Sequence, residues 1–191
     1  MGKIILVTGG ARSGKSRFAE KIASNLSGKV LYVATAKAID SEMEHRIAHH
    51  KQMRPNEWGT FEGYKGFNNQ TFVELAKGYE VVLVDCLTIM CTNIILEQWV
   101  DPKVDTDYLY DNETADLIEK KVLIEANGLM NALEDAGVLS ILVTNEVGMG
   151  LVPEYPLGRL FRDIAGRVNQ RVADRASEVH LCVSGLSIQI K

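Results

Sequence analysis

The chain has 191 residues, of which 46% are apolar and 24% charged, and its formal net charge is −4. This length and composition predict one soluble globular domain over residues 1–191. They disfavour nucleic acid as a partner, because there is no net basic charge, and membrane insertion, because no apolar run approaches the roughly 20 residues that span a bilayer. The three dispersed cysteines form no CxxC pair and the start of the chain shows no signal-peptide pattern, so we expect a cytoplasmic protein.

Short apolar runs alternate with segments of helical pattern along the chain. The runs are rich in β-branched residues and do not alternate with polar ones, which predicts buried parallel strands. The expected strands are 3–9, 29–35, 80–86, 139–147 and 178–185, and the expected helices are 15–26, 40–53, 87–98, 113–136 and 157–175. Ser184-Gly185 predicts a tight hairpin to a last strand at 186–191. The fold class is therefore α/β, a mostly parallel sheet with helices on both faces and a C-terminal antiparallel hairpin.

Polar segments interrupt this alternation at three places. Residues 54–79 contain a proline, glycines and aromatics and predict an ordered loop, and residues 100–114 predict an acidic, exposed insertion. Residues 145–159 follow the fourth strand and predict a long loop rich in glycine and proline. Since parallel sheets bind ligands at the carboxyl ends of their strands, this last loop is expected on the functional edge.

The segment GGARSGKS matches the phosphate-binding pattern G-x-x-x-x-G-K-[ST] in full. It follows a predicted strand and precedes a predicted helix, so its backbone N–H groups and the helix dipole can point at phosphate oxygens. Lys15 should reach the β- and γ-phosphates, and the Ser16 hydroxyl should ligate Mg²⁺. The predicted nucleotide-binding residues of this loop are Gly9, Gly10, Ala11, Arg12, Ser13, Gly14, Lys15 and Ser16.

Asp85 ends the apolar run VVLVDC and is the candidate carboxylate that orients Mg²⁺ opposite this loop. The alternative is that Asp85 caps the helix that begins near Leu87. The loop and the carboxylate together indicate a nucleotide-binding protein that uses ATP or GTP, with Ser16 and Asp85 as metal ligands. They do not identify the reaction, because ATPases, GTPases and small-molecule kinases share this arrangement.

Three of the four histidines, His45, His49 and His50, lie within six residues. A helix over 40–53 places His45 and His49 one turn apart, while His50 shares a face with Arg46. The cluster is consistent with a solvated basic surface. It also suits a zinc pair, although it lacks the glutamate of HExxH and an evident third ligand. A third reading is a histidine nucleophile that attacks an α-phosphorus and stores a nucleotidyl group as a phosphoramidate.

Six segments carry a resemblance to a known family: ILVTGGARSGKSRFAE, VLYVATA, RIAHHKQMRPNEW, TNEVGMGLVPEYPLGR, FRDIAGRVNQ and VSGLSIQIK. From about residue 4 to the C-terminus the chain resembles the bacterial bifunctional adenosylcobinamide kinase/adenosylcobinamide-phosphate guanylyltransferases. The resemblance implies a RecA-like P-loop fold and a homotrimer. It also implies two reactions, phosphorylation of the aminopropanol hydroxyl of adenosylcobinamide and transfer of GMP from GTP through an enzyme histidine to give adenosylcobinamide-GDP. The implied ligands are adenosylcobinamide, its phosphate, ATP, GTP and Mg²⁺.

The family pattern R-I-x-x-H-x-x-x-R-P places the guanylylated histidine at His50 in preference to His49. The resemblance further implies nucleotide contacts at Ala34, Thr35, Ala36, Lys51, Gln52, Met53, Arg54, Glu62 and Asp85. Some relatives have glutamate where this chain has Asp85, so direct and water-mediated Mg²⁺ contacts both stay open. It also stays open whether His50 meets the phosphate loop of its own chain or of a neighbouring one. In the loop over 145–159, Met149, Leu151 and Val152 either form an apolar floor for a corrin ring or pack under their own loop.

Overall fold

One mixed sheet organises the part of the chain that the computed structural model describes, residues 2–26, 29–38, 41, 44–45, 47–48, 51, 55–98 and 111–191. It has seven strands in the order β3-β2-β4-β5-β1-β6-β7. Neighbouring strands are parallel except for β6 and β7, which form an antiparallel hairpin. The strands are β1 (Ile4–Gly9), β2 (Val30–Ala34), β3 (Gly59–Glu62), β4 (Val81–Asp85), β5 (Leu139–Val143), β6 (Glu178–Val183) and β7 (Leu186–Gln189).

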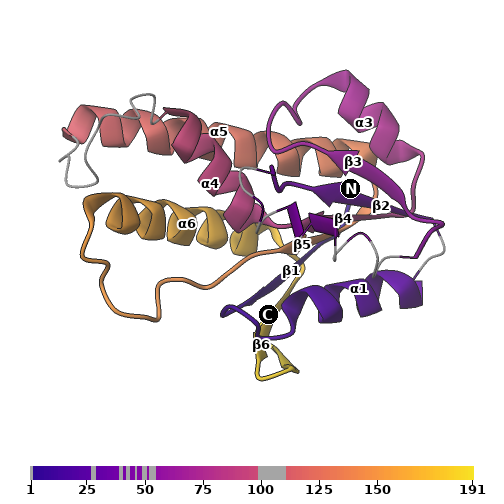
Figure 1. Ribbon diagram of the computed structural model, residues 1–191. Coiled ribbons are helices and arrows are strands. Elements are labelled where there is room, and N and C mark those ends of the chain that lie inside the picture. Colours follow the sequence, from indigo (N-terminus) through magenta and orange to yellow (C-terminus); the bar gives the residue numbers. More distant parts are fainter. Residues whose placement is uncertain are drawn as a thin grey trace.

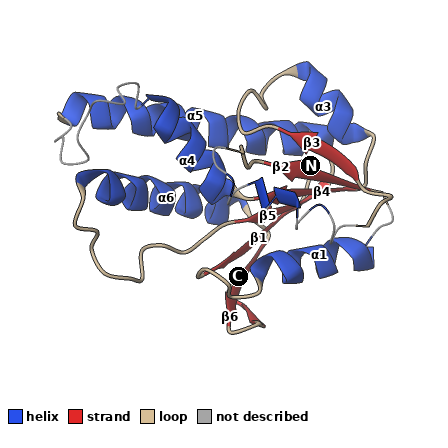
Figure 2. Ribbon diagram, in the orientation of Figure 1, coloured by secondary structure: helices blue, strands red, loops and turns tan. Residues whose placement is uncertain are grey.

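Helices cover both faces of this sheet (Figures 1 and 2). The helix α1 (Lys15–Leu26) lies on one face, with Ala19 and Ala23 buried against the strands. The other face is covered by α3 (Gln70–Lys77), α4 (Leu87–Gln98), α5 (Asn112–Ala136) and α6 (Pro156–Arg175). The predicted α/β class, with its parallel sheet and C-terminal hairpin, is confirmed. No helix in the described ranges is long and apolar enough to cross a bilayer.

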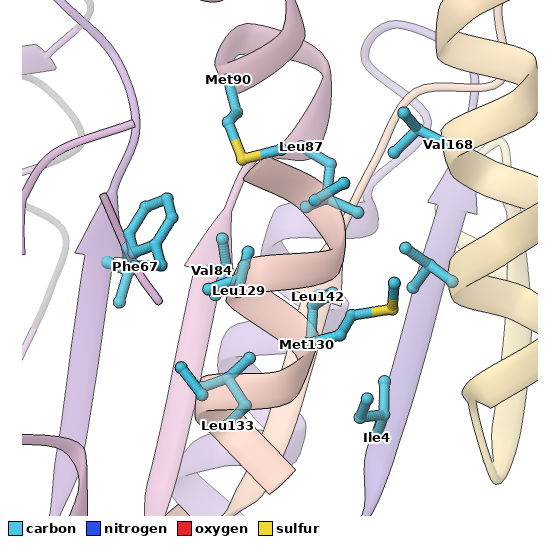
Figure 3. Close-up of a cluster of buried hydrophobic side chains, with 14 of the residues drawn as sticks. Ile4, Phe67, Val84, Leu87, Met90, Leu129, Met130, Leu133, Leu142 and Val168 are labelled. Carbon is cyan, nitrogen blue, oxygen red and sulfur yellow. The ribbon is translucent and has the colours of Figure 1, made fainter. Parts of the chain in front are cut away.

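The two covered faces explain why the strand sequences are apolar throughout. In β1, Ile4 and Leu6 point into the core under α4, α5 and α6, whereas Ile5 and Val7 point into the core under α1. Both sets are buried, so the period-2 alternation of a one-sided strand is absent. Figure 3 shows the larger core, which contains Ile4, Phe67, Val84, Leu87, Met90, Leu129, Met130, Leu133, Leu142 and Val168. This packing fixes the carboxyl ends of the central strands, where the candidate site lies.

The prediction of a loop over 54–79 was wrong, because this segment contains both β3 and α3. β3 is only four residues long and pairs with β2 at the edge of the sheet, so its sequence carries little pattern. The side chain of Asn69 caps α3 by accepting a hydrogen bond from the Phe72 N–H at 2.8 Å. The aromatic residues Phe67 and Phe72 that suggested an ordered loop are buried core residues.

Two boundaries also differ from the prediction. The fourth predicted strand, 139–147, ends at Val143, and the chain then runs irregularly to Pro156. The predicted insertion 100–114 includes the start of α5, whose N-cap Asp111 accepts a hydrogen bond from the Thr114 N–H at 2.7 Å. This hydrogen bond lowers the pKa of Asp111. Residues 99–110 lie outside the described part of the chain.

Candidate active site

The phosphate loop joins the end of β1 to the start of α1, as the motif requires. Gly14 has a φ of 94°, and a Cβ there would lie 3.0 Å from the Cα of Gly185. A Cβ on Gly9 would collide with the carbonyl oxygen of Cys182 on the neighbouring strand β6. Both positions therefore require glycine. The Gly185 N–H also donates to the Ser13 carbonyl at 2.9 Å, so the C-terminal hairpin supports the phosphate loop directly.

Lys15 is almost buried, with 8% of its surface exposed, and its Nζ donates to the Gly10 carbonyl at 2.9 Å. Burial lowers the pKa of Lys15, while the nearby Cys86, Asp85 and Cys182 raise it in part. A desolvated ammonium that donates to a neutral carbonyl lacks a full counter-charge. Phosphate oxygens of a nucleotide would supply that charge.

Asp85 is held in place by interactions between β2 and β4. The Tyr32 hydroxyl donates to Asp85 Oδ2 at 2.8 Å from a nearly fully buried ring. One residue beyond β2, the buried Thr35 hydroxyl donates to the Cys86 carbonyl and accepts from the Cys86 N–H, both at 2.8 Å. Asn93 of α4 donates to the Thr35 carbonyl at 2.8 Å. Thr35 was predicted to line the nucleotide site, but its side chain instead links the end of β2 to the end of β4 through Cys86.

A cavity of about 950 Å³ brings these elements together at the carboxyl ends of the strands. Its volume is within the range of roughly 300–1,000 Å³ found for small-molecule sites. The predicted site residues that line it are Ala11, Arg12, Lys15, Ser16, Ala34, Ala36, Lys51, Glu62 and Asp85. The remaining lining residues are Tyr32, Lys37, Ala38, Ile47, Gly63, Tyr64, Cys86, Ile89 and Asn145. Asp85 therefore lines the same space as the phosphate loop, as the metal-side role predicted for it requires.

The segment with the histidines contributes Ile47 and Lys51 to this cavity. Lys51 Nζ forms an ion pair with Glu62 Oε1 at 2.6 Å, which joins the segment to the end of β3. Both side chains are more than half exposed, so the pair adds little stability and is free to rearrange around a ligand. His45 is helical and exposed. The predicted site residues His50, Gln52, Met53 and Arg54, and also His49, lie outside the described part of the chain.

Several residues of the cavity lining were not predicted from the sequence, because only the fold brings them to the site. Lys37 Nζ lies 5.2 Å from the centroid of the Tyr64 ring, and the Tyr64 hydroxyl donates to Glu97 of α4. These contacts hold an aromatic ring and a cation side by side in the cavity lining, a combination that suits a nucleotide base or its phosphates. The aromatic content of 54–79 was the only signal for Tyr64, and that segment was taken as a loop.

Cysteine nucleophiles are disfavoured in this cavity. Cys86 lines it, but burial and the Asp85 charge raise the pKa of its thiol to about 12. The pKa of Cys91 is also raised to about 12 by burial, and that of Cys182 is raised. All three stay protonated thiols near neutral pH and are poor nucleophiles.

The arrangement around Ser16 and Asp85 fits Mg²⁺. No cluster of three or more histidine, cysteine or acidic side chains occurs in the described ranges, so nothing there forms a protein cage of the zinc type. Mg²⁺ is usually held by one or two protein oxygens together with substrate phosphates and water. A hydroxyl at Ser16 and a carboxylate at Asp85, on one cavity beside the phosphate loop, are such a donor set.

Two further features lie outside this cavity. Met149, Leu151 and Val152 do not pack under their loop, since all are exposed and Leu151 is 94% exposed. A second cavity of about 560 Å³ lies between α6 and the strands β1 and β6, with Asp163 and Arg167 in its lining. Arg167 also forms an ion pair with Glu119 of α5.

The fold and the Gly9–Ser16 loop define a protein of the P-loop nucleotide-binding class. Residues 5–190 match the family described as cobinamide kinase / cobinamide phosphate guanyltransferase, and the chain belongs to this family. It is 45% identical over 189 residues to the bifunctional adenosylcobalamin biosynthesis protein CobU of Escherichia coli K12, covering 98% of this chain and 99% of the relative. The CobU protein of Salmonella typhimurium LT2 is 43% identical, with 98% and 99% covered. The CobP protein of Pseudomonas aeruginosa is 39% identical, with 97% and 96% covered. The family predicted from the motifs is confirmed.

Proposed function

We propose that this chain phosphorylates adenosylcobinamide with ATP or GTP and then transfers GMP from GTP, through a guanylyl-histidine, to give adenosylcobinamide-GDP. The observation that carries the proposal is one cavity lined both by Lys15 of the phosphate loop and by Lys51 of the histidine segment. A triphosphate held by the loop would extend toward the segment that bears the predicted nucleophile. Family membership supports the same pair of reactions.

In the kinase step the phosphate loop and Lys15 bind the β- and γ-phosphates of the nucleotide. The aminopropanol hydroxyl attacks the γ-phosphorus and releases its proton to water, and the bond to the β,γ-bridging oxygen breaks, so that the nucleoside diphosphate leaves with the electron pair. Ser16 and Asp85 would hold Mg²⁺, which supplies charge neutralisation between the phosphates when bound. The Tyr32 hydroxyl fixes the orientation of the Asp85 carboxylate throughout.

In the guanylyl step we assign His50 as the nucleophile. It is adjacent in the chain to Lys51, which lines the cavity, and Cys86, which also lines it, is a protonated thiol. A neutral imidazole nitrogen forms a bond to the α-phosphorus of GTP and pyrophosphate leaves, which gives a phosphoramidate. The phosphate of the phosphorylated corrinoid then attacks this phosphorus, and the histidine leaves as the protonated imidazole.

Product analysis by mass spectrometry tests the proposed function. With ATP and Mg²⁺ alone, the protein should convert adenosylcobinamide to its phosphate. With GTP it should go on to adenosylcobinamide-GDP and pyrophosphate. If only adenosylcobinamide phosphate forms in the presence of GTP, the protein is a small-molecule kinase without guanylyltransferase activity. Nucleotide turnover without any corrinoid product would rule out both activities.

We also propose that the protein assembles as a homotrimer in the cytoplasm, with the C-terminal hairpin in the subunit interface. β7 is the edge of the sheet and all of its residues are exposed. The exposed apolar side chains of the hairpin and the following residue are Val183, Leu186, Ile188 and Ile190. An open edge strand with apolar side chains favours association with another chain.

A double substitution, Leu186→Asp with Ile188→Asp, should therefore convert the trimer to monomers. Sedimentation velocity at micromolar concentration measures this change. Leu117→Asp on α5 is the matched control, because Leu117 is also exposed but lies on another element. A wild-type monomer, or a double variant that remains trimeric, would contradict the assignment.

A further inference from the structure

Asn145 lines the nucleotide cavity at a position that no motif assigned. It lies two residues beyond β5, and β5 lies between β1, which leads into the phosphate loop, and β4, which ends in Asp85. Asn145 therefore lines the same cavity as Lys15 and Asp85, the two groups predicted to flank the transferred phosphate.

The main chain of Asn145 is held by a closed ring of hydrogen bonds. Its N–H donates to Thr88 Oγ1 at 2.6 Å, and its carbonyl accepts from Asn169 Nδ2 at 3.0 Å. Thr144 closes the ring: its Oγ1 lies 3.3 Å from Thr88 Oγ1 and donates to Asn169 Oδ1 at 2.7 Å. Thr88, Thr144 and Asn169 are buried and come from α4, the end of β5 and α6. The ring fixes the Asn145 backbone from three elements.

The side chain of Asn145 takes no part in this ring. Its Oδ1 is buried and has no hydrogen-bond partner among the residues that the structure describes. Buried side-chain acceptors are normally paired, so an unpaired one beside a phosphate site points to a missing donor. Nucleotide phosphates cannot be that donor, because their oxygens carry almost no protons at neutral pH. A hydroxyl group or a water molecule can be that donor.

We propose that Asn145 Oδ1 accepts a hydrogen bond from the substrate hydroxyl that is phosphorylated, and so aims that oxygen at the γ-phosphorus. This inference rests on the proposed function and names a substrate contact within it. During transfer the hydroxyl oxygen bonds to the γ-phosphorus, the bond to the bridging oxygen breaks, and the nucleoside diphosphate leaves with the electron pair. The hydroxyl proton passes to water in the open cleft, because an amide oxygen is too weak a base to keep it. Asn145 orients the nucleophile and does not act as a base.

Comparing the two half-reactions distinguishes a contact with the substrate hydroxyl from a contribution of Asn145 to both reactions. Guanylylation uses the α-phosphorus and an enzyme histidine, and no substrate hydroxyl takes part in it. Asn145→Ala should lower kcat/KM for phosphorylation of adenosylcobinamide by about 100-fold, the order of loss expected from misplacing a reacting group. The rate of GMP-adduct formation from GTP and the affinity for a fluorescent GTP analogue should stay unchanged.

Thermal stability supplies a second readout. Since no hydrogen bond of the ring uses the Asn145 side chain, Asn145→Ala should leave the Tm unchanged or raise it. Asn145→Leu should repeat the kinetic result. Because leucine has a similar volume and no polar side-chain atoms, this variant controls for a loss of packing in Asn145→Ala. Thr88→Val is the contrasting change, because it breaks the ring and should lower the Tm.

Three outcomes would overturn the assignment. Full kinase activity in both Asn145 variants would exclude a contact with the hydroxyl. Equal losses in both half-reactions, with weaker Mg²⁺-dependent nucleotide binding, would assign Oδ1 to a metal-bound water. A large fall in Tm would make Asn145 a structural residue. If instead the wild-type protein forms no phosphorylated corrinoid, the proposed function itself fails, whatever the variants do.

Discussion

His50→Ala is expected to abolish the covalent GMP adduct and adenosylcobinamide-GDP formation while preserving phosphorylation of adenosylcobinamide. The imidazole is the protein group that bonds to the α-phosphorus in our account, and the corrinoid phosphate receives GMP only from it. The γ-phosphate chemistry uses Lys15, Ser16 and Asp85, which line the cavity independently of His50. Radiolabelling with α-labelled GTP measures the adduct, and corrinoid phosphate formation with ATP measures the kinase step.

His49→Ala and His45→Ala are the matched controls for this experiment. Both alter neighbouring histidines of the same segment and should keep the adduct, which should be acid-labile and alkali-stable as a phosphoramidate. Labelling that persists in His50→Ala but disappears in His49→Ala would move the nucleophile by one residue. The family assignment would stand in that case, since it depends on the match over residues 5–190.

Lys15→Met is expected to abolish both reactions. Lys15 is the buried cation of the phosphate loop, and both steps require a bound triphosphate. The loss in kcat/KM should be at least about 100–1,000-fold, the magnitude typical of removing one preorganised charge-stabilising group. Lys21→Met on the same helix is the control, because Lys21 is exposed and should retain full activity.

The same substitution should also change stability in the absence of nucleotide. Burial lowers the pKa of Lys15, so the unfolded chain binds more protons than the folded one between the lowered pKa and the ordinary lysine value. The free energy of unfolding therefore rises with pH across that interval, and Lys15→Met removes this contribution. Urea unfolding at neutral and alkaline pH measures it. Unaltered GTP affinity in Lys15→Met, or a stability that depends on pH as in the wild type, would contradict this account of the phosphate loop.

The sequence predicted the parts of the site that lie in local patterns. The phosphate loop is recognisable because strand, glycines and helix start are contiguous, and the strands because both of their faces are buried. Asp85 was identified by its place at the end of a strand, and the structure puts it on the same cavity as Ser16. The resemblance implied nucleotide contacts for both Ala34 and Thr35. Ala34 lines the cavity, whereas Thr35 is buried and its side chain is hydrogen-bonded to Cys86.

The parts that were missed depend on which strands become neighbours. Asn145 and Tyr32 reach the cavity only because β5 lies between β1 and β4, and β2 lies beside β4. Both lie in segments that carry the family resemblance, but nothing in those segments marks either residue as part of the site. β3 was missed for a related reason, since a four-residue edge strand is specified by its partner β2 more than by its own sequence.

The central claim is that one polypeptide stores GMP on a histidine and passes it to a phosphorylated corrinoid. Intact-mass measurement of the wild-type protein tests it most directly, first after GTP and Mg²⁺ and again after addition of adenosylcobinamide phosphate. We predict a mass increase of one GMP group per chain, followed by a return to the starting mass as adenosylcobinamide-GDP forms. A protein whose mass never changes while adenosylcobinamide-GDP accumulates, or an adduct that the corrinoid phosphate does not discharge, would contradict the account.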